Sequence, residues 1–373
     1  MPRQDVLTTA KAQNKNEFYT QYEDIEKEVN AYIEYNPDVF RDKVILLPCD
    51  DPEWSNFTKY FAANFERLGI KKLISTSYAR GWANYHQITL FELESPQYDE
   101  TKHEAHGKKF VLERDVDGSG RIDQKDIEWE YLEGDGDFTS EEITKLRDEA
   151  DIIITNPPFN TMFHEFFEWV MESGKKFLFI ASINSITFVD VFPRIRNGEV
   201  WVGTGMGRWI SGFIVPDDYE LYGTETRMNE KGKKIISTNN CLWYTNLDHG
   251  KRHEPLKLMT MSDNLKYNKS LCKKLEKKFG DSSQYYHYDN YDALDVPLTE
   301  AIPSDYDGVM GVPISFLDKY CPEQFEILDA NDYRKNSKTP YKKHGLVKDK
   351  DSAINGSPQY ARMLIRKRGV NNE

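Results

Sequence analysis

An Asn-Pro-Pro-Phe sequence, Asn156-Pro157-Pro158-Phe159, has the residue types needed to methylate an exocyclic amine. The amino nitrogen of adenine is a poor nucleophile because its lone pair is delocalised into the ring. An enzyme must therefore hold this nitrogen beside a methyl donor and accept hydrogen bonds from its two protons. The Asn156 side-chain oxygen and the Pro157 carbonyl can accept these hydrogen bonds. The prolines stiffen the loop, and Phe159 offers a face on which a purine can stack. We assign Asn156, Pro157 and Phe159 to a candidate catalytic site; a strand followed by a proline-rich turn is the alternative.

The flanking sequence predicts a strand, a tight loop and a helix around this motif. Residues 150–155 form a short, β-branched apolar run typical of a strand buried on both faces. Apolar residues then recur at helical spacing from Met162 to Val170, and Gly174 follows as a helix end. A second buried strand is expected at 176–181. The motif would thus lie at the carboxyl end of a parallel strand, where open α/β sheets bind their ligands.

The segments before the motif predict alternating strands and helices. Residues 44–47 and 72–76 indicate short buried strands, and Ser55 is a suitable N-cap for a helix that ends before Gly69. This order predicts an α/β fold with a doubly wound, mostly parallel sheet. Further extended segments that favour hairpins are expected at 88–93, 109–113 and 127–132.

Length and composition indicate two domains with sizeable cores, since the 373 residues are 39% hydrophobic and 13% aromatic. The first residues lack the apolar core of a signal peptide, and no apolar stretch approaches the length of a membrane span. We therefore expect a cytoplasmic protein with no membrane partner. Four widely separated cysteines have no metal-ligand spacing, which predicts reduced thiols and no metal site. They are Cys49, Cys241, Cys272 and Cys321.

The net charge of the chain argues against a nucleic-acid partner, but the distribution of that charge weakens this argument. A net charge of −13 opposes binding to phosphates. Residues 331–373, however, hold 11 Lys and Arg against 4 Asp and Glu, which leaves 38 against 58 in the rest of the chain. Such asymmetry indicates a basic arm or face at the C-terminus, and a solvated charged tail is the alternative.

Several blocks of sequence resemble those of EcoRI-type adenine-specific DNA methyltransferases, and they occur in the same order along nearly the whole chain. The block at 306–320 is far more specific than Asn-Pro-Pro-Phe. Besides that motif, the blocks are NEFYTQ at 16–21, PCDDPEWSNF at 48–57, GDGDF at 134–138, WYTNL at 243–247, YDGVMGVPI at 306–314 and FLDKY at 316–320.

The resemblance implies a Rossmann-like S-adenosylmethionine-dependent methyltransferase fold at 1–250 and a DNA target-recognition region at 251–373. The implied reaction moves a methyl group from S-adenosylmethionine to N6 of an adenine flipped out of double-stranded DNA, catalysed by a monomer in a bacterial or phage-infected cell. Two alternatives stay open. One is a methyltransferase for RNA bases or a protein glutamine, and the other is an inactive relative that only binds DNA.

The same resemblance implies a donor-binding site assembled from three segments. Residues 18–20 match the segment that folds over the donor's methionine end, 49–51 match the first donor-binding motif, and 137–138 match the acidic-aromatic pair that holds the donor's adenine. The turn after the first strand departs from the glycine-rich turn usual in adenine methyltransferases. The expected donor-binding residues are Phe18, Tyr19, Thr20, Cys49, Asp50, Asp51, Asp137 and Phe138.

Phosphate contacts are expected after residue 250, where cations alternate with tyrosines. The candidate DNA-binding residues are Arg252, Lys335, Lys342, Lys343, Arg362, Arg366, Lys367 and Arg368.

A stretch at 115–126 has nearly the spacing of a calcium-binding loop. Its flanking residues, however, alternate in polarity like the two strands of a hairpin, so a turn is favoured and no metal is predicted.

Overall fold

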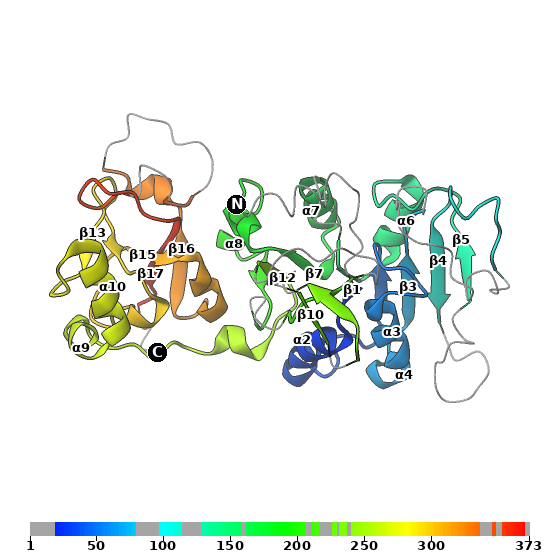
Figure 1. Cartoon of the computed structure of the whole chain (residues 1–373), viewed down its shortest axis with the longest axis horizontal. Helices are drawn as coiled ribbons and strands as arrows, with labels where there is room; N and C mark the ends of the chain where they lie inside the picture. The colour runs from blue at the N-terminus through cyan, green and yellow to red at the C-terminus, as the bar shows by residue number, and fades with distance from the viewer. Residues whose placement is uncertain are drawn as a thin grey trace. The chain divides into compact units, whose positions relative to one another are not determined.

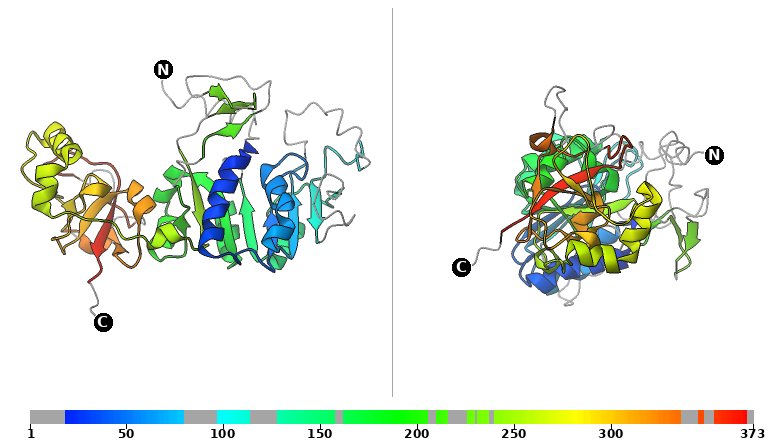
Figure 2. Two further views of the ribbon diagram at one scale, coloured as in Figure 1. Left: turned by 90° about the horizontal axis from the view of Figure 1, so that it is seen from below. Right: turned by 90° about the vertical axis from the view of Figure 1, so that its left-hand side faces the viewer.

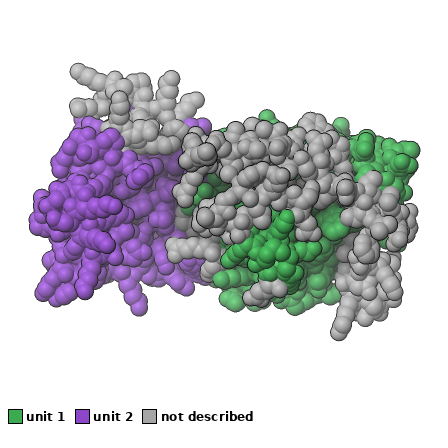
Figure 3. Space-filling model, viewed as in Figure 1, with its two compact units in different colours: residues 1–183, 207–248 green, residues 184–206, 249–373 purple. Residues whose placement is uncertain are grey.

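The structure is a computed structural model in which two compact units are distinguished (Figure 3). Unit 1 comprises residues 1–183 and 207–248, and unit 2 comprises 184–206 and 249–373. The sequence predicts a single division near residue 250, whereas the structure also assigns 184–206 to unit 2. The residues described are 19–79, 97–113, 128–157, 162–205, 210–215, 226–229, 231–236, 240–335, 345–347 and 353–369.

A mixed sheet forms the centre of unit 1, and its middle strands are parallel in the order β3-β2-β6-β7. Antiparallel strands extend it on both sides, with β4 and β5 beyond β3 and β12 beyond β7. The predicted buried strands and the hairpin partners around 109–113 and 127–132 are confirmed. The strands are β2 (Val44–Leu47), β3 (Lys72–Thr76), β4 (Lys108–Leu112), β5 (Trp129–Tyr131), β6 (Ile152–Thr155), β7 (Lys176–Ser182) and β12 (Cys241–Thr245).

Helices cover both faces of this sheet (Figures 1 and 2). On one face lie α2 (Tyr22–Tyr35), α3 (Asn56–Ala63) and α4 (Phe65–Leu68), and on the other lie α6 (Glu141–Glu149) and α7 (Phe163–Glu172).

The helix predicted to begin at Ser55 is divided into α3 and α4. Ser55 caps it as predicted, since its hydroxyl accepts from the Phe57 N–H at 3.0 Å. The division occurs at Asn64, whose side-chain amide donates to the Tyr60 carbonyl at 2.8 Å and thereby competes with the backbone for it.

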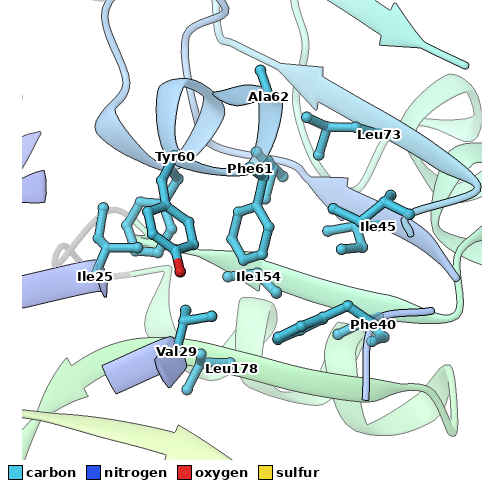
Figure 4. Packing of buried hydrophobic residues seen from close by; sticks show 14 of the residues in the cluster. Ile25, Val29, Phe40, Ile45, Tyr60, Phe61, Ala62, Leu73, Ile154 and Leu178 are labelled. Carbon is cyan, nitrogen blue, oxygen red and sulfur yellow. The ribbon is translucent and has the colours of Figure 1, made fainter. Parts of the chain in front are cut away.

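Alternate residues of the central strands pack into two separate layers. Ile152 and Ile154 belong to a cluster with Phe61 of α3 and residues of α2 (Figure 4). In the other layer, Phe166 of α7 packs edge-on against Phe179 of β7, with ring centroids 5.4 Å apart. Burial on both faces explains why these strands are continuous apolar runs.

A small antiparallel sheet also belongs to unit 1. Its order is β1-β9-β11-β10, so the described chain start pairs with a segment almost 200 residues later. The strands are β1 (Tyr19–Thr20), β9 (Phe213–Ile214), β10 (Thr226–Met228) and β11 (Lys234–Ile236).

Unit 2 is built on a second mixed sheet with the order β13-β14-β15-β17-β16. Its strands are β13 (Tyr286–His287), β14 (Leu294–Asp295), β15 (Met310–Pro313), β16 (Phe325–Leu328) and β17 (Arg362–Lys367). The 184–206 part of unit 2 also contains β8 (Trp201–Val202), which is not a strand of this sheet. Its helices are α8 (Phe192–Arg196), α9 (Met261–Tyr267) and α10 (Lys269–Phe279), with 3₁₀ turns at Gly250–His253, Thr299–Ala301, Ile314–Lys319 and Ala330–Tyr333.

The block at 306–320, which resembles the methyltransferase family, contains β15, and Gly311 in this strand has a packing role. A Cβ on Gly311 would lie 2.4 Å from the Tyr288 hydroxyl, which crosses the strand to donate to Asp295 at 2.5 Å. Only glycine leaves room for this ring. The expected strand at 88–93 and the calcium-like stretch at 115–126 lie outside the described residues.

Candidate active site

The predicted site residues of unit 1 converge at the carboxyl end of the parallel strands. Asp50 and Asp51 follow β2, and Asn156 follows β6. Tyr78, which was not a predicted site residue, follows β3. Because β3, β2 and β6 are adjacent and parallel, these residues lie at one edge of the sheet (Figure 1). A fourth segment, containing Asp137, is brought to the same edge by the backbone packing described below.

Asp50, which follows β2, is hydrogen-bonded to the start of α3 and to the end of β6 at this edge. Its carboxylate accepts from the Ser55 hydroxyl at the start of α3 and from the Thr155 hydroxyl at the end of β6, each at 2.7 Å. It also receives the backbone N–H of Asn156. With both oxygens so occupied and 4% of the residue exposed, Asp50 positions the Asn156 loop. Its predicted direct contact with a methyl donor stays a prediction.

Burial raises the pKa of Asp50 to about 7. The hydrogen bonds from Ser55, Thr155 and Asn156 oppose that rise because they favour the ionised form. The neighbouring Cys49 thiol has a raised pKa as well, owing first to desolvation and then to the negative charge of Asp50. Cys49 is therefore a protonated thiol near neutral pH and has little nucleophilic character.

Asp51 holds the turn that replaces a glycine-rich loop. Its Oδ1 accepts the backbone N–H groups of Glu53 and Trp54 at 2.8 and 3.1 Å. Its Oδ2 lies 3.8 Å from the ammonium of Lys108, which also pairs with Glu53 and lies 4.5 Å from the centre of the Trp129 ring. The turn is thus fixed by a hydrogen-bonded and ion-paired cluster.

Lys108 is a site residue that the motifs did not predict, although the sequence holds a signal for it. Its side chain is only 5% exposed. In a strand, residues two apart face the same side, and Lys108 is in phase with the buried Phe110 and Leu112. That phase predicts an inward-facing cation, which requires a carboxylate partner.

Close backbone packing brings Asp137 to the end of β3. The Ala79 N–H donates to the Asp135 carbonyl at 2.6 Å. Gly136 has a φ of +82°, and a Cβ there would lie 2.1 Å from the Ser77 carbonyl oxygen. Only a residue without a side chain permits this approach.

The Asp137 carboxylate is oriented within its own turn and acts on two neighbours. Its Oδ1 accepts from the backbone N–H and the hydroxyl of Thr139, both at 2.7 Å. Burial, and then the charge of Asp137, raises the pKa of the Tyr78 hydroxyl. The same charge also contributes to the raised pKa of the Cys49 thiol. Asp137, Tyr78 and Cys49 therefore lie close together.

Phe138 occupies a different environment from Asp137. Its ring is fully buried and packs edge-on against Phe166 and Trp169, with centroids 5.4 and 5.7 Å apart. The structure gives it a core position under the Asp137 turn. Its expected packing on a donor's adenine stays a prediction.

The chain start lies beside the beginning of α3. The Asn56 side chain donates to the Thr20 carbonyl at 2.7 Å, which joins Tyr19 and Thr20 to the segment following Asp50 and Asp51. Thr20 is 2% exposed, and among the described residues its hydroxyl has no hydrogen-bond partner. Phe18 lies outside the described residues.

The Asn-Pro-Pro-Phe loop is described only in its first half. Thr155 is fully buried and bonded to Asp50, Asn156 is partly exposed, and Pro157 is buried. Pro158 and Phe159 lie outside the described residues. The start of the loop is therefore anchored to the sheet edge on which the donor-site candidates lie.

The candidate DNA-binding residues in β17 and directly after it have partners within unit 2. Arg362 is 6% exposed and donates to Asp295 at 3.2 Å. Arg366 pairs with Glu326 at 2.6 Å, and Lys367 pairs with Asp307 at 3.1 Å. Arg368 donates to the Pro322 carbonyl at 2.7 Å. This part of the basic C-terminal segment is a strand between β15 and β16, and its predicted role in binding phosphate stays a prediction.

The remaining candidates for DNA contact are dispersed. The Arg252 guanidinium lies 4.0 Å from the centre of the Trp201 ring, in a pocket of unit 2 that also includes Tyr320. Lys335 donates to the Tyr288 carbonyl at 2.8 Å. Lys342 and Lys343 lie outside the described residues.

Neither a metal cluster nor a membrane-spanning helix is present in the part of the chain that is described. No group of three or more His, Cys, Asp or Glu side chains there could hold a metal ion. No helix there is long and apolar enough to cross a membrane.

Comparison with known proteins gives matches along nearly the whole chain. Type II methyltransferase M.EcoRI of Escherichia coli is 44% identical over 97% of this chain and 96% of its own length. M.MgeORF184P of Mycoplasma genitalium is 30% identical over 97% and 98%, and M.MpnI of Mycoplasma pneumoniae is 29% identical over 96% and 97%. No solved structure matches. Residues 6–368 match the family described as adenine-specific methyltransferase EcoRI, and the chain belongs to that family.

Proposed function

We propose that this protein transfers a methyl group from S-adenosylmethionine to N6 of an adenine in double-stranded DNA. The observation that carries the proposal is the meeting of Asn156, Asp51 and Asp137 at one edge of a parallel sheet in a member of this family. The parallel β3-β2-β6-β7 order with helices on both faces supports a Rossmann-like, doubly wound catalytic domain.

The residues at the edge fit a methyl donor that carries an adenine, a ribose and an amino acid. Thr20 supplies a buried hydroxyl that has no partner among the described residues. Asp137 is held with one oxygen bonded to Thr139, which suits it to accept from the amino group of the donor's adenine. Tyr19 and Asp51 complete the expected contacts. S-adenosylmethionine, when bound, supplies an activated methyl group on a positively charged sulfur.

Asn156 and Pro157 would hold the target amine. The Asn156 side-chain oxygen and the Pro157 carbonyl accept hydrogen bonds from the two N6 hydrogens. These bonds aim the nitrogen at the donor and stabilise the positive charge that develops on N6. Phe159 stacks on the adenine ring. Asp50 acts through the loop, because it receives the Asn156 N–H and the Thr155 hydroxyl.

The target adenine must leave the duplex to reach this edge. Unstacking and unpairing cost a few kcal/mol, which contacts to the flipped base offset. Unit 2 is the proposed target-recognition region. The type II names of the relatives support a role in restriction and modification.

A substrate panel tests the proposal. Purified protein with radiolabelled S-adenosylmethionine should label duplex DNA, and digestion of the product should yield N6-methyladenine. Label in RNA or in a protein glutamine would support the alternative enzyme classes. Donor and DNA binding without transfer to any substrate would support an inactive relative.

A further inference from the structure

We propose that a row of lysines on α10, here called the lysine row and made of Lys269, Lys273 and Lys277, binds the DNA phosphate backbone. This inference rests on the proposed function. It concerns a surface separate from the basic C-terminal segment, and it begins from charge. Residues 266–278 contain six lysines and one acidic residue, Glu276, in a chain whose net charge is −13.

The rotation of α10 is fixed by its core contacts. Leu271 and Leu275 are buried against unit 2, with 0% and 1% exposure. At 100° per residue, the lysine row is centred about 180° from these leucines and so faces away from the core. Asn268 caps the helix through a bond of 3.0 Å from the Leu271 N–H, which makes α10 a well-defined element.

The lysines of α10 divide into two sets with different environments. Lys274 donates to the Pro297 carbonyl at 3.0 Å, and Lys278 lies 3.6 Å from Asp295. Burial lowers the pKa of both. The three members of the lysine row are exposed, and no carboxylate in the described residues lies within ion-pair distance of them. Their charges are therefore available to an external anion.

The spacing within the lysine row has an energetic cost in the free protein. Lys269 and Lys273 are four residues apart, as are Lys273 and Lys277, and like charges at this spacing repel each other and destabilise a helix. An ion-paired solvent face would place carboxylates at alternate positions. A bound polyanion instead relieves the repulsion.

The dimensions of the lysine row match a nucleic-acid strand. The eight residue-to-residue steps from Lys269 to Lys277 span about 12 Å along the helix. One strand of DNA carries a phosphate about every 3.4 Å along the duplex axis, so the row spans three to four phosphates. In the preceding helix α9, Tyr267 is 60% exposed, and the Lys266 ammonium lies 4.8 Å from the centre of its ring. An exposed aromatic ring of this kind is one on which a nucleic-acid base can stack.

The internal partners of the β17 cations make this surface the stronger candidate in the described part of unit 2. Arg362, Arg366 and Lys367 each have a carboxylate partner there, whereas the lysine row has none. Phosphate neutralisation dominates the affinity of proteins for DNA. An acidic protein that acts on DNA requires a concentrated set of available cations.

The test is a triple variant, Lys269→Gln, Lys273→Gln and Lys277→Gln, with a control triple in unit 1 that removes the same charge, Lys71→Gln, Lys145→Gln and Lys176→Gln. Lys71 and Lys176 stand at the amino edge of the sheet, opposite the candidate site. Lys145 is 71% exposed and pairs with Glu141, and Lys176 donates to the Asn246 carbonyl. Binding of specific and unrelated duplexes is measured by fluorescence anisotropy between 50 and 300 mM salt. Over this range the Debye length falls from about 14 to about 6 Å. S-adenosylmethionine binding and thermal unfolding are measured on the same samples.

The α10 triple should weaken binding to both duplexes by on the order of tenfold to a hundredfold near 150 mM salt. The slope of log affinity against log salt should fall by about 0.9 for each phosphate that the variant no longer neutralises. Donor affinity and the unfolding temperature should stay within error of the wild type, and the unit 1 triple should bind DNA as the wild type does. An unchanged slope in a folded α10 triple overturns the inference. Failure of the wild type to methylate DNA would instead overturn the proposed function.

Discussion

At the scale of single residues, the site separates groups that would touch ligands from groups that position them. Asp137 keeps a carboxylate oriented by Thr139 at the edge of the sheet, whereas Asp50 uses both oxygens to join β2, α3 and β6. Acidic residues that look equivalent in the motifs therefore have different roles in the fold.

Substituting Asp137 by alanine should weaken S-adenosylmethionine binding by on the order of tenfold to a hundredfold. The reason is the loss of a charge-assisted hydrogen bond of about 1.5–3 kcal/mol. Isothermal titration calorimetry measures the effect. A matched control exists in Asp99→Ala, because Asp99 makes the same two bonds to Thr101 in an Asp-x-Thr turn. Equal donor affinity in the two variants would remove Asp137 from the site.

The buried Asp50 predicts a pH dependence of stability. Its folded pKa, about 7, lies above the ordinary value of 3.8, so its contribution to stability is fully present below about pH 4 and is lost as the pH rises to 7. The free energy of unfolding of the wild type minus that of Asp50→Asn should fall by at most about 1.4 kcal/mol per pH unit over this window. Urea unfolding at pH 5, 6, 7 and 8 measures it, with the exposed Asp38→Asn as a control. A difference that grows with pH would show that Asp50 is preferentially ionised in the fold.

At the scale of elements, the sequence predicts those whose pattern depends on local burial. The strands at 44–47, 72–76 and 176–181 are predictable because they are apolar on both faces. The strand β17 was not predicted, because Arg362, Arg366 and Lys367 give its segment the character of a charged tail. Its apolar centre at 363–365 is the signal that indicates a strand, and its charges are tolerated because carboxylates from other strands meet them.

The convergence of the site could be predicted only in part. The ends of β2 and β6 were expected to meet, since parallel strands share an edge. The position of Asp137 depends on Gly136 approaching the Ser77 carbonyl, which is a contact between distant segments that no local pattern encodes. The same holds for Lys108 and its partners in the Asp51 turn.

Lys108, the buried lysine of β4, is predicted to stabilise the turn that contains Asp51 and Glu53. Lys108→Met should lower the free energy of unfolding by on the order of 2 kcal/mol, because Asp51 and Glu53 lose their cation while still partly buried. Donor affinity should fall as well, since the Asp51 turn loses a restraint. Lys109→Met is the matched control on the opposite face of the strand, where the pair with the 69% exposed Glu130 contributes about 0–1 kcal/mol. Similar losses in both variants would contradict a special role for Lys108.

At the scale of the whole molecule, the chain combines an acidic total charge with membership of a family of DNA-modifying enzymes. Unit 1 contains the convergent edge, and unit 2 contains the lysine row and the ion-paired sheet. This division predicts that changes in unit 2 alter DNA affinity while leaving donor affinity intact. Changes at Asp137 or Asp51 should have the reverse effect.

The central claim is that Asn156 holds the amine that receives the methyl group. The most direct measurement is sequencing of DNA for N6-methyladenine after expression of the wild type and of Asn156→Ala in a host that lacks DNA methylation. The wild type should modify adenine within one short, recurring sequence. Asn156→Ala should leave the DNA unmodified while binding S-adenosylmethionine within a fewfold of the wild type, because the missing acceptor acts chiefly in the transition state. Near wild-type methylation by Asn156→Ala, or no N6-methyladenine from the wild type, would contradict the account.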